Sequence, residues 1–142
     1  MKIFYRAFSI AILLGMLANI AQAEIVLITN KASKLPGITL EEVGKLYLGK
    51  SKSFSNGERA SVADYSPGVD IRQQFYKKTL KMTDSEVSRY WAKRKFTRKL
   101  KPPKIISDDK AMKQWVASAP NTLGYIDGTL IDNSVKVLLI IP

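Results

Sequence analysis

Short β-branched runs alternate along the chain with segments that open on helix-capping residues. Strands are expected at residues 24–29, 60–64, 123–127 and 135–140, and helices are expected to start near Thr39, Val69, Thr83 and Ser107. Strands that alternate with capped helices predict an α/β fold in which helices cover a mixed or mostly parallel sheet. The sequence carries no internal repeat and no low-complexity linker, so a single domain is expected.

Two capping boxes mark the starts of two of these helices. Glu42 follows Thr39 by three residues, and Glu86 follows Thr83 in the same way. In each pair the hydroxyl is placed to accept from the backbone of the glutamate, whose carboxylate reaches back to the first residue. Gly49 is expected to end the first of these helices in a left-handed conformation.

The last helix is expected to be capped by Ser107, with acidic residues in its first turn. Its apolar side is a stripe with helical spacing, formed by Met112, Trp115, Val116 and Ala119. Trp91 and Trp115 both lie on apolar helix faces. We therefore expect them in the core and not as platforms for a ligand.

The first 23 residues have the pattern of a cleavable signal peptide. Lys2 and Arg6 precede an apolar run at residues 7–17, and Ala21-Gln22-Ala23 supplies the small residues of a cleavage site. A membrane anchor is the alternative, but the apolar run is shorter than the roughly 20 residues of a spanning helix. We expect cleavage near Ala23, which would give a periplasmic or secreted domain of residues 24–142.

The composition excludes several classes of enzyme. The chain has no cysteine and no histidine. Disulfides, zinc–thiolate sites and hydrolases of the Ser–His–Asp or Cys–His type therefore cannot be built from it. We expect a protein that is not an enzyme and that needs no cofactor or metal ion.

The formal net charge is +11, and removal of Lys2 and Arg6 with the signal peptide leaves +9. This charge favours anionic partners. Nucleic acid is not expected as a partner outside the cytoplasm.

Five short motifs follow one another in the mature sequence: Leu40-Glu41-Glu42-Val43 with Tyr47-Leu48-Gly49-Lys50, Phe54-x-Asn56-Gly57, Arg72-x-x-Phe75-Tyr76, Tyr90-Trp91 and Phe96-Thr97 with Pro102-Pro103, and Leu123-Gly124-Tyr125. In this order they resemble segments of the bacterial phosphate-binding proteins that serve ABC transporters, over nearly all of residues 25–139. Members of that family have two lobes that clamp the ligand between them, and the chain resembles roughly the second lobe. The resemblance implies a half-size, single-domain lobe of the periplasmic-binding-protein (type II) fold, and the first lobe is expected to be absent. It does not by itself imply transport.

The turn before the second helix is the candidate anion site. Backbone N–H groups at a helix N-terminus bind oxyanions together with the helix dipole. Ser66 offers a hydroxyl, Gly68 lets a ligand approach the backbone, and Arg72 offers a bidentate fork. The alternative is that Ser66 and Asp70 cap the helix and that Arg72 is solvated.

This turn departs from the family that it resembles. Phosphate-binding members carry Ser-Gly-Thr just before the arginine, where this chain has Val69, Asp70 and Ile71. Two hydroxyl donors are lost and a carboxylate is gained. Two like charges ~4 Å apart cost on the order of 4 kcal/mol at an effective dielectric constant near 20. We therefore expect weak or altered binding of phosphate or another oxyanion by the amides of residues 68–70.

Thr29 and Asn30 come directly after the first expected strand. Open α/β sheets place ligands at the carboxyl ends of their strands, so we expect these two residues to contribute to the same cleft. The alternative is an ordinary polar loop after a buried strand.

A segment dense in cations precedes the last helix. Seven of the twelve residues from 93 to 104 are basic: Lys93, Arg94, Lys95, Arg98, Lys99, Lys101 and Lys104. Such a segment can bind anionic headgroups or phosphate-rich polymers, although a solvated loop would have the same composition.

Two functions are therefore open at this stage. One is an oxyanion-binding domain that has an ABC permease or a second copy of itself as a partner. If this domain needs a second cleft wall, a partner chain or a homodimer must provide it. The other is a scaffold that has lost its ligand and uses the basic segment on an anionic envelope surface or an acidic partner.

Overall fold

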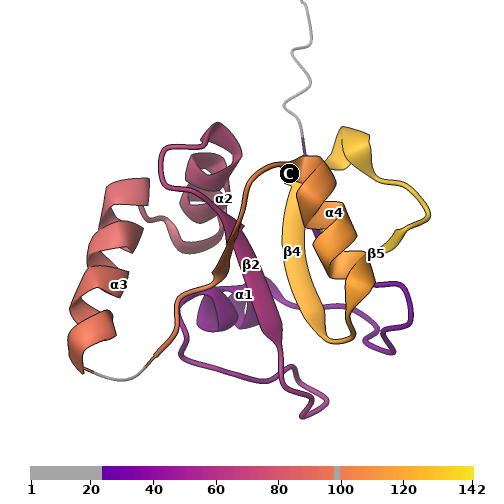
Figure 1. Ribbon diagram of the computed structural model, residues 1–142, viewed down its shortest axis with the longest axis horizontal. Helices are drawn as coiled ribbons and strands as arrows, with labels where there is room; N and C mark the ends of the chain where they lie inside the picture. The colour runs from indigo at the N-terminus through magenta and orange to yellow at the C-terminus, as the bar shows by residue number, and fades with distance from the viewer. Residues whose placement is uncertain (1–23, 98–99) are drawn as a thin grey trace, which may run out of the picture.

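The computed structural model describes residues 24–97 and 100–142, so the expected signal peptide lies outside the described residues. The elements in chain order are β1 (Ile25–Asn30), α1 (Leu40–Tyr47), β2 (Ser61–Tyr65), α2 (Asp70–Leu80), α3 (Asp84–Thr97), β3 (Lys104–Ile106), α4 (Asp109–Ser118), β4 (Thr122–Asp127) and β5 (Val135–Ile141), with a 3₁₀ turn at Gly128–Leu130 after β4. Strands and helices thus alternate through most of the chain, and the expected α/β fold is confirmed (Figure 1).

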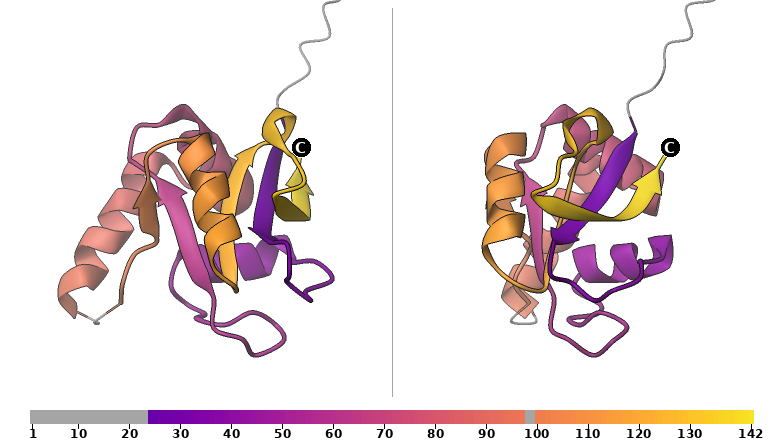
Figure 2. Two further views of the ribbon diagram at one scale, coloured as in Figure 1. Left: turned by 45° about the vertical axis from the view of Figure 1, so that its right-hand side comes forward. Right: turned by 90° about the vertical axis from the view of Figure 1, so that its right-hand side faces the viewer.

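The strands form a five-stranded sheet in the order β3-β2-β4-β1-β5. β2 pairs in parallel with β3 and β4, whereas β1 pairs antiparallel with β4 and β5. The sheet is therefore mixed. β2 and β4 point the same way and β1 points the opposite way, so the end of β1 lies level with the start of β2 (Figure 2).

Helices cover both faces of this sheet, with α4 on one face and α1 on the other (Figure 2). Successive residues of β4 face the two helix layers alternately. Gly124 lies so close to α4 that a Cβ atom there would be 2.6 Å from the sulfur of Met112. Tyr125 points to the other face, where its ring stacks on Phe75 of α2 at 3.9 Å and meets Tyr47 of α1 edge-on at 5.8 Å.

The local helix signals are confirmed at α1 and α3. Both halves of the Thr39–Glu42 capping box are present, and Thr83 and Glu86 exchange the same pair of hydrogen bonds at the start of α3. Gly49 has φ +67°, and its N–H donates to the carbonyl of Leu46 after the end of α1. This is the left-handed helix end that the sequence predicts.

Two local expectations need correction. The N-cap of α4 is Asp108, whose side chain accepts from the amide of Ala111, and not Ser107. Aspartate and serine are equally good caps, so the sequence does not decide between neighbours. The three-residue strand β3, which begins at the last residue of the basic segment, was not expected. Trp91 is buried in the core as expected, whereas Trp115 is half-buried against its edge.

Within residues 24–97 and 100–142, the helices are too short or too polar to cross a membrane.

Gly49 offers a test of how α1 and α3 are joined. A Cβ atom on Gly49 would lie 2.8 Å from the Trp91 ring, whereas one on Gly57, which also has a positive φ, would meet nothing within 4 Å. Both Gly→Ala substitutions carry the left-handed strain of about 1–2 kcal/mol, and only Gly49→Ala adds a clash with a buried ring. We predict that urea unfolding finds Gly49→Ala less stable than Gly57→Ala by about 1–3 kcal/mol. Equal losses would show that Trp91 does not hold the end of α1.

Candidate functional site

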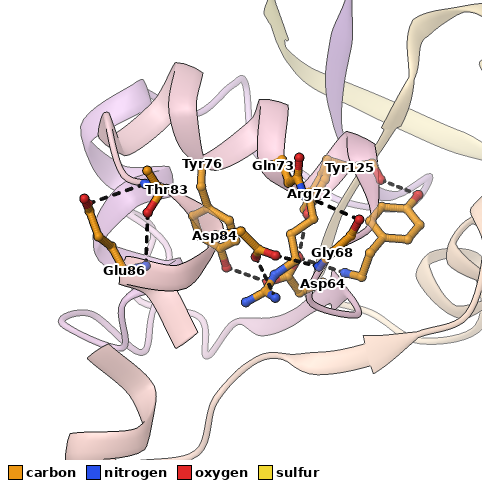
Figure 3. A network of polar contacts seen from close by, with 10 residues as sticks. Asp64, Gly68, Arg72, Gln73, Tyr76, Thr83, Asp84, Glu86 and Tyr125 are labelled. Carbon is orange, nitrogen blue, oxygen red and sulfur yellow. Dashed lines mark hydrogen bonds and ion pairs between the residues drawn. The ribbon is translucent and has the colours of Figure 1, made fainter. Parts of the chain in front are cut away.

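Asp64 lies at the centre of a buried polar network at the end of β2 (Figure 3). Its carboxylate accepts hydrogen bonds from the hydroxyls of Tyr76 and Tyr125. It also accepts from the amide of Tyr65 at 2.8 Å and from Nε of Arg72 at 3.3 Å. The carboxylate is thus held by β4 and α2 as well as by its own strand, as a buried charge requires.

Arg72 carries the network from Asp64 to a second carboxylate. The residue is only 4% exposed, and its Nη1 lies 2.8 Å from Oδ1 of Asp84. The other oxygen of Asp84, Oδ2, accepts the amide of Gly68 at 2.5 Å. A hydrogen bond from a backbone amide and an ion pair with a guanidinium therefore hold this carboxylate. Backbone amides and guanidinium groups are also the groups that hold a bound oxyanion.

The sequence positions Asp84 through the start of α3. The capping box at Thr83 begins the helix, so Asp84 is its first residue and lies beside the turn before α2 (Figure 3). Gly68 has φ +89°, a conformation that glycine adopts without strain. The N-cap of α2, Val69, contributes no side-chain acceptor. The Gly68 amide at this turn thus receives an acceptor from another helix.

Burial sets the ionisation behaviour of the network. Burial raises the pKa of Asp64, and the hydrogen bonds from Tyr125 and Tyr76 and the charge of Arg72 act against this shift. Burial also raises the pKa values of Tyr65, Tyr76 and Tyr125, and the nearby Asp64 charge adds to each shift. The phenols therefore stay protonated and remain donors at neutral pH.

The residues expected in the anion turn are brought together, but their roles differ. Ser66 is exposed, and its carbonyl accepts from the amide of Val69 at 3.2 Å. Asp70 accepts from the side-chain amide of Gln74 at 2.7 Å. Neither side chain is the N-cap of α2, and Arg72 is buried, so the alternative of two capping residues and a solvated arginine is wrong.

Thr29 and Asn30 lie away from this turn, which corrects the expectation of a shared cleft. Thr29 pairs with Leu123, and Leu123 with Val62 near the start of β2, whereas Gly68 follows the end of β2. The antiparallel direction of β1 causes this separation. Thr29 donates its hydroxyl to the carbonyl of Thr122 at 2.6 Å.

Asn30 instead secures the end of α4. Its side-chain amide donates to three carbonyls there, at 3.0–3.2 Å: Val116, Ala117 and Ala119. Its role in the structure is therefore to join β1 to α4.

The basic segment is divided between α3, β3 and the residues between them. Lys93, Lys101 and Lys104 are exposed. Lys104 also lies 5.9 Å from the ring centre of Trp115, and Arg94 packs its guanidinium over the Tyr90 ring at 3.5 Å. Lys95 lies in α3, whereas Arg98 and Lys99 lie outside the described residues.

Asp64, Asp84 and the two tyrosines of the network were not among the expected site residues. Asp84 had a visible signal, because it directly follows the capping threonine of α3. Its approach to Gly68 is a contact between residues 16 positions apart, which local patterns do not contain. No group of acidic side chains in the described ranges is arranged to hold a metal ion.

This architecture is that of a lobe of the periplasmic-binding-protein fold, as solved structures show. A phosphate ABC transporter substrate-binding protein of Clostridium perfringens, solved with bound phosphate, matches with a TM-score of 0.65 and 22% identity over 82% of this chain. A phosphate transport receptor of Vibrio cholerae matches with a TM-score of 0.64 and 16% identity, and PstS of Borrelia burgdorferi with 0.62 and 14%. The chain spans 45–47% of the length of these three proteins. No protein-family model and no curated protein matches the sequence.

The buried phenols predict a steep loss of stability in alkali. The pKa values of Tyr47, Tyr65, Tyr76 and Tyr125 are raised in the fold, so above about pH 10 the unfolded chain releases protons that the folded protein keeps. Below that pH these tyrosines do not change the free energy of unfolding, because they are protonated in both states. Above it, each tyrosine lowers this free energy by about 1.4 kcal/mol per pH unit.

We predict that tyrosinate absorbance and loss of circular dichroism rise together in one alkaline transition. Tyr47→Phe removes a phenol that donates to the carbonyl of Ala63 and not to Asp64, and should reduce the slope by about a quarter. A smooth tyrosinate titration near pH 10 in a protein that stays folded would contradict the burial of these hydroxyls.

Proposed function

We propose that this protein is a binding domain of the periplasmic-binding-protein fold whose own Asp84 occupies its oxyanion site. The observation that carries the proposal is the pair of contacts to Asp84, from the Gly68 amide and from the Arg72 guanidinium. A free oxyanion needs these same donors. Phosphate or a related oxyanion therefore binds weakly, in competition with Asp84. The protein acts as a binding module and not as an enzyme.

The energetics of the pair set the size of this effect. Arg72 is buried, and removing one partner of a buried ion pair costs about 3–5 kcal/mol when nothing replaces it. An incoming anion replaces the carboxylate and recovers part of this cost. If opening costs a net ~2.7 kcal/mol, the open state is about 1% populated and the apparent affinity falls about 100-fold.

A hollow lies beside Asp84, and it would admit an anion to the side of the site that Asp84 occupies. It has a volume of about 490 Å³, and Lys77, Lys81 and Gln73 line it together with Asp84. Two lysines at its wall attract an anion and offer Asp84 a new ion pair when it leaves Gly68.

The resemblance to two-lobed proteins supports an assignment of the partners. The three solved neighbours are about twice as long as this chain. A partner would then supply the opposite wall of the cleft, either an ABC permease or a second copy of the chain. Export by the signal sequence would place this domain in the periplasm.

Replacing Asp84 tests the proposal. Asp84→Ala frees the Gly68 amide and Arg72, so phosphate should bind at least about 10-fold more tightly than to the unchanged protein. Glu41→Ala is the matched control, because it also removes one carboxylate from a first helical turn, that of α1, and leaves both contacts to Asp84 in place. We expect it to change the affinity less than about threefold, since Glu41 lies outside the anion turn and its removal alters only the overall charge. Calorimetric titration with phosphate and sulfate measures both variants.

Thermal unfolding distinguishes a variant that does not fold from one that folds but does not bind. Asp84→Ala leaves Arg72 without one partner, so its melting temperature should fall without anion and rise again with added phosphate. Replacing Arg72 by Ala in addition should abolish this recovery. A folded Asp84→Ala protein that binds no oxyanion would overturn the proposal and favour the second candidate, a scaffold that has lost its ligand.

A further inference from the structure

A second hollow lies at the opposite end of β2 from the Gly68 turn. It has a volume of about 280 Å³, and we call it the basic groove. Its lining includes Gly49, Ser51, Lys52, Arg59, Lys101 and Pro102. Arg59 comes before β2 and Gly68 after it. The two sites are therefore separated by the length of the strand, roughly 16 Å at about 3.3 Å per residue. The basic groove shares no residue with the Asp84 site.

Three cations from two separate segments converge on the basic groove. Lys52 and Arg59 come from the loop before β2, and Lys101 comes from the residues before β3. No carboxylate lines the hollow, and within the described part of the chain none of the three cations forms an ion pair. Glu58, next to Arg59, is bonded to the side-chain amide of Asn56. Thus no described carboxylate forms a direct ion pair with a cation of the groove.

The wall that carries Lys52 and Arg59 is held by backbone hydrogen bonds. The amide of Ala60 donates to the carbonyl of Lys52 at 2.9 Å, and Ser53 and Arg59 form an antiparallel bridge. Gly49 also lines the groove, and it lies so close to Trp91 that a Cβ atom there would be 2.8 Å from the ring. The backbone of this wall is therefore ordered before a ligand binds, and binding has to order only the exposed cationic side chains.

The size and charge of the groove indicate the ligand chemistry. Its volume lies just below the range of about 300–1,000 Å³ for small-molecule pockets, so it accepts a compact group. An arginine fork with two ammonium groups fits a doubly charged phosphate better than a carboxylate. We propose that the basic groove binds a phosphate monoester dianion, carried by a soluble molecule or by a lipid headgroup.

The test compares two triple variants that lose the same charge. The groove variant is Lys52→Gln/Arg59→Gln/Lys101→Gln. The control is Lys34→Gln/Arg89→Gln/Lys110→Gln, whose three side chains are exposed and lie outside the groove. The probes are glycerol 3-phosphate, measured by calorimetry, and phosphatidylcholine vesicles with and without phosphatidic acid, measured by co-sedimentation, at about 0.15 M salt.

We expect the unchanged protein to bind at least one phosphate monoester probe. Binding should fall roughly 100-fold in the groove variant, about fivefold for each cation, and only a few-fold in the control. Binding of the soluble probe identifies a free phosphate ester as the source, and binding of phosphatidic acid vesicles alone identifies a headgroup. Equal losses in the two variants, or no binding of either probe, would overturn the assignment. Asp84 and Arg72 are intact in both variants, so the result is independent of the first site.

Discussion

The buried guanidinium of Arg72 is the constraint on which the polar interior of this domain depends. A charge in this position needs carboxylates beside it, and the fold supplies Asp64 from β2 and Asp84 from α3. Two carboxylates against one guanidinium leave an excess of negative charge. The phenols of Tyr76 and Tyr125 and the Gly68 amide offset it by donating hydrogen bonds. The network around this one charge thus joins β2, β4, α2 and α3.

On our proposal, this arrangement gives the domain the fold of its neighbours but a different binding behaviour. The lobe has the architecture of phosphate transport receptors, but its own acidic side chain lies against the donors that an anion would use. In the proposed competition, an internal carboxylate needs no diffusion to the site and would therefore outcompete dilute anions. The positive charge of the chain does not remove this competition, because it attracts free anions without displacing a paired one. Three cations that form no ion pair within the described residues lie elsewhere, in the basic groove.

The sequence predicts those features that local chemistry decides. The capping boxes at Thr39 and Thr83 and the left-handed Gly49 act within one helical turn, and all three are found. Ser107 and Asp108 are equivalent caps, so a shift of one residue there is invisible to a local pattern. Strand direction is not a local property, and the expected role of Thr29 and Asn30 in the cleft assumed a direction that β1 does not have. The Asp84 contact joins two turns that only the packing of α3 against α2 brings together.

The amide proton of Gly68 gives the most direct test of the central claim that Asp84 fills the anion site. Gly68 is exposed and lies outside the helices and strands, so without this contact its amide would exchange freely with solvent. In a nuclear magnetic resonance experiment, we predict a Gly68 amide that is shifted downfield, protected from hydrogen exchange and unmoved by submillimolar phosphate. An unprotected amide whose resonance moves with submillimolar phosphate would contradict the account, because it would show that the site is open in the unliganded protein.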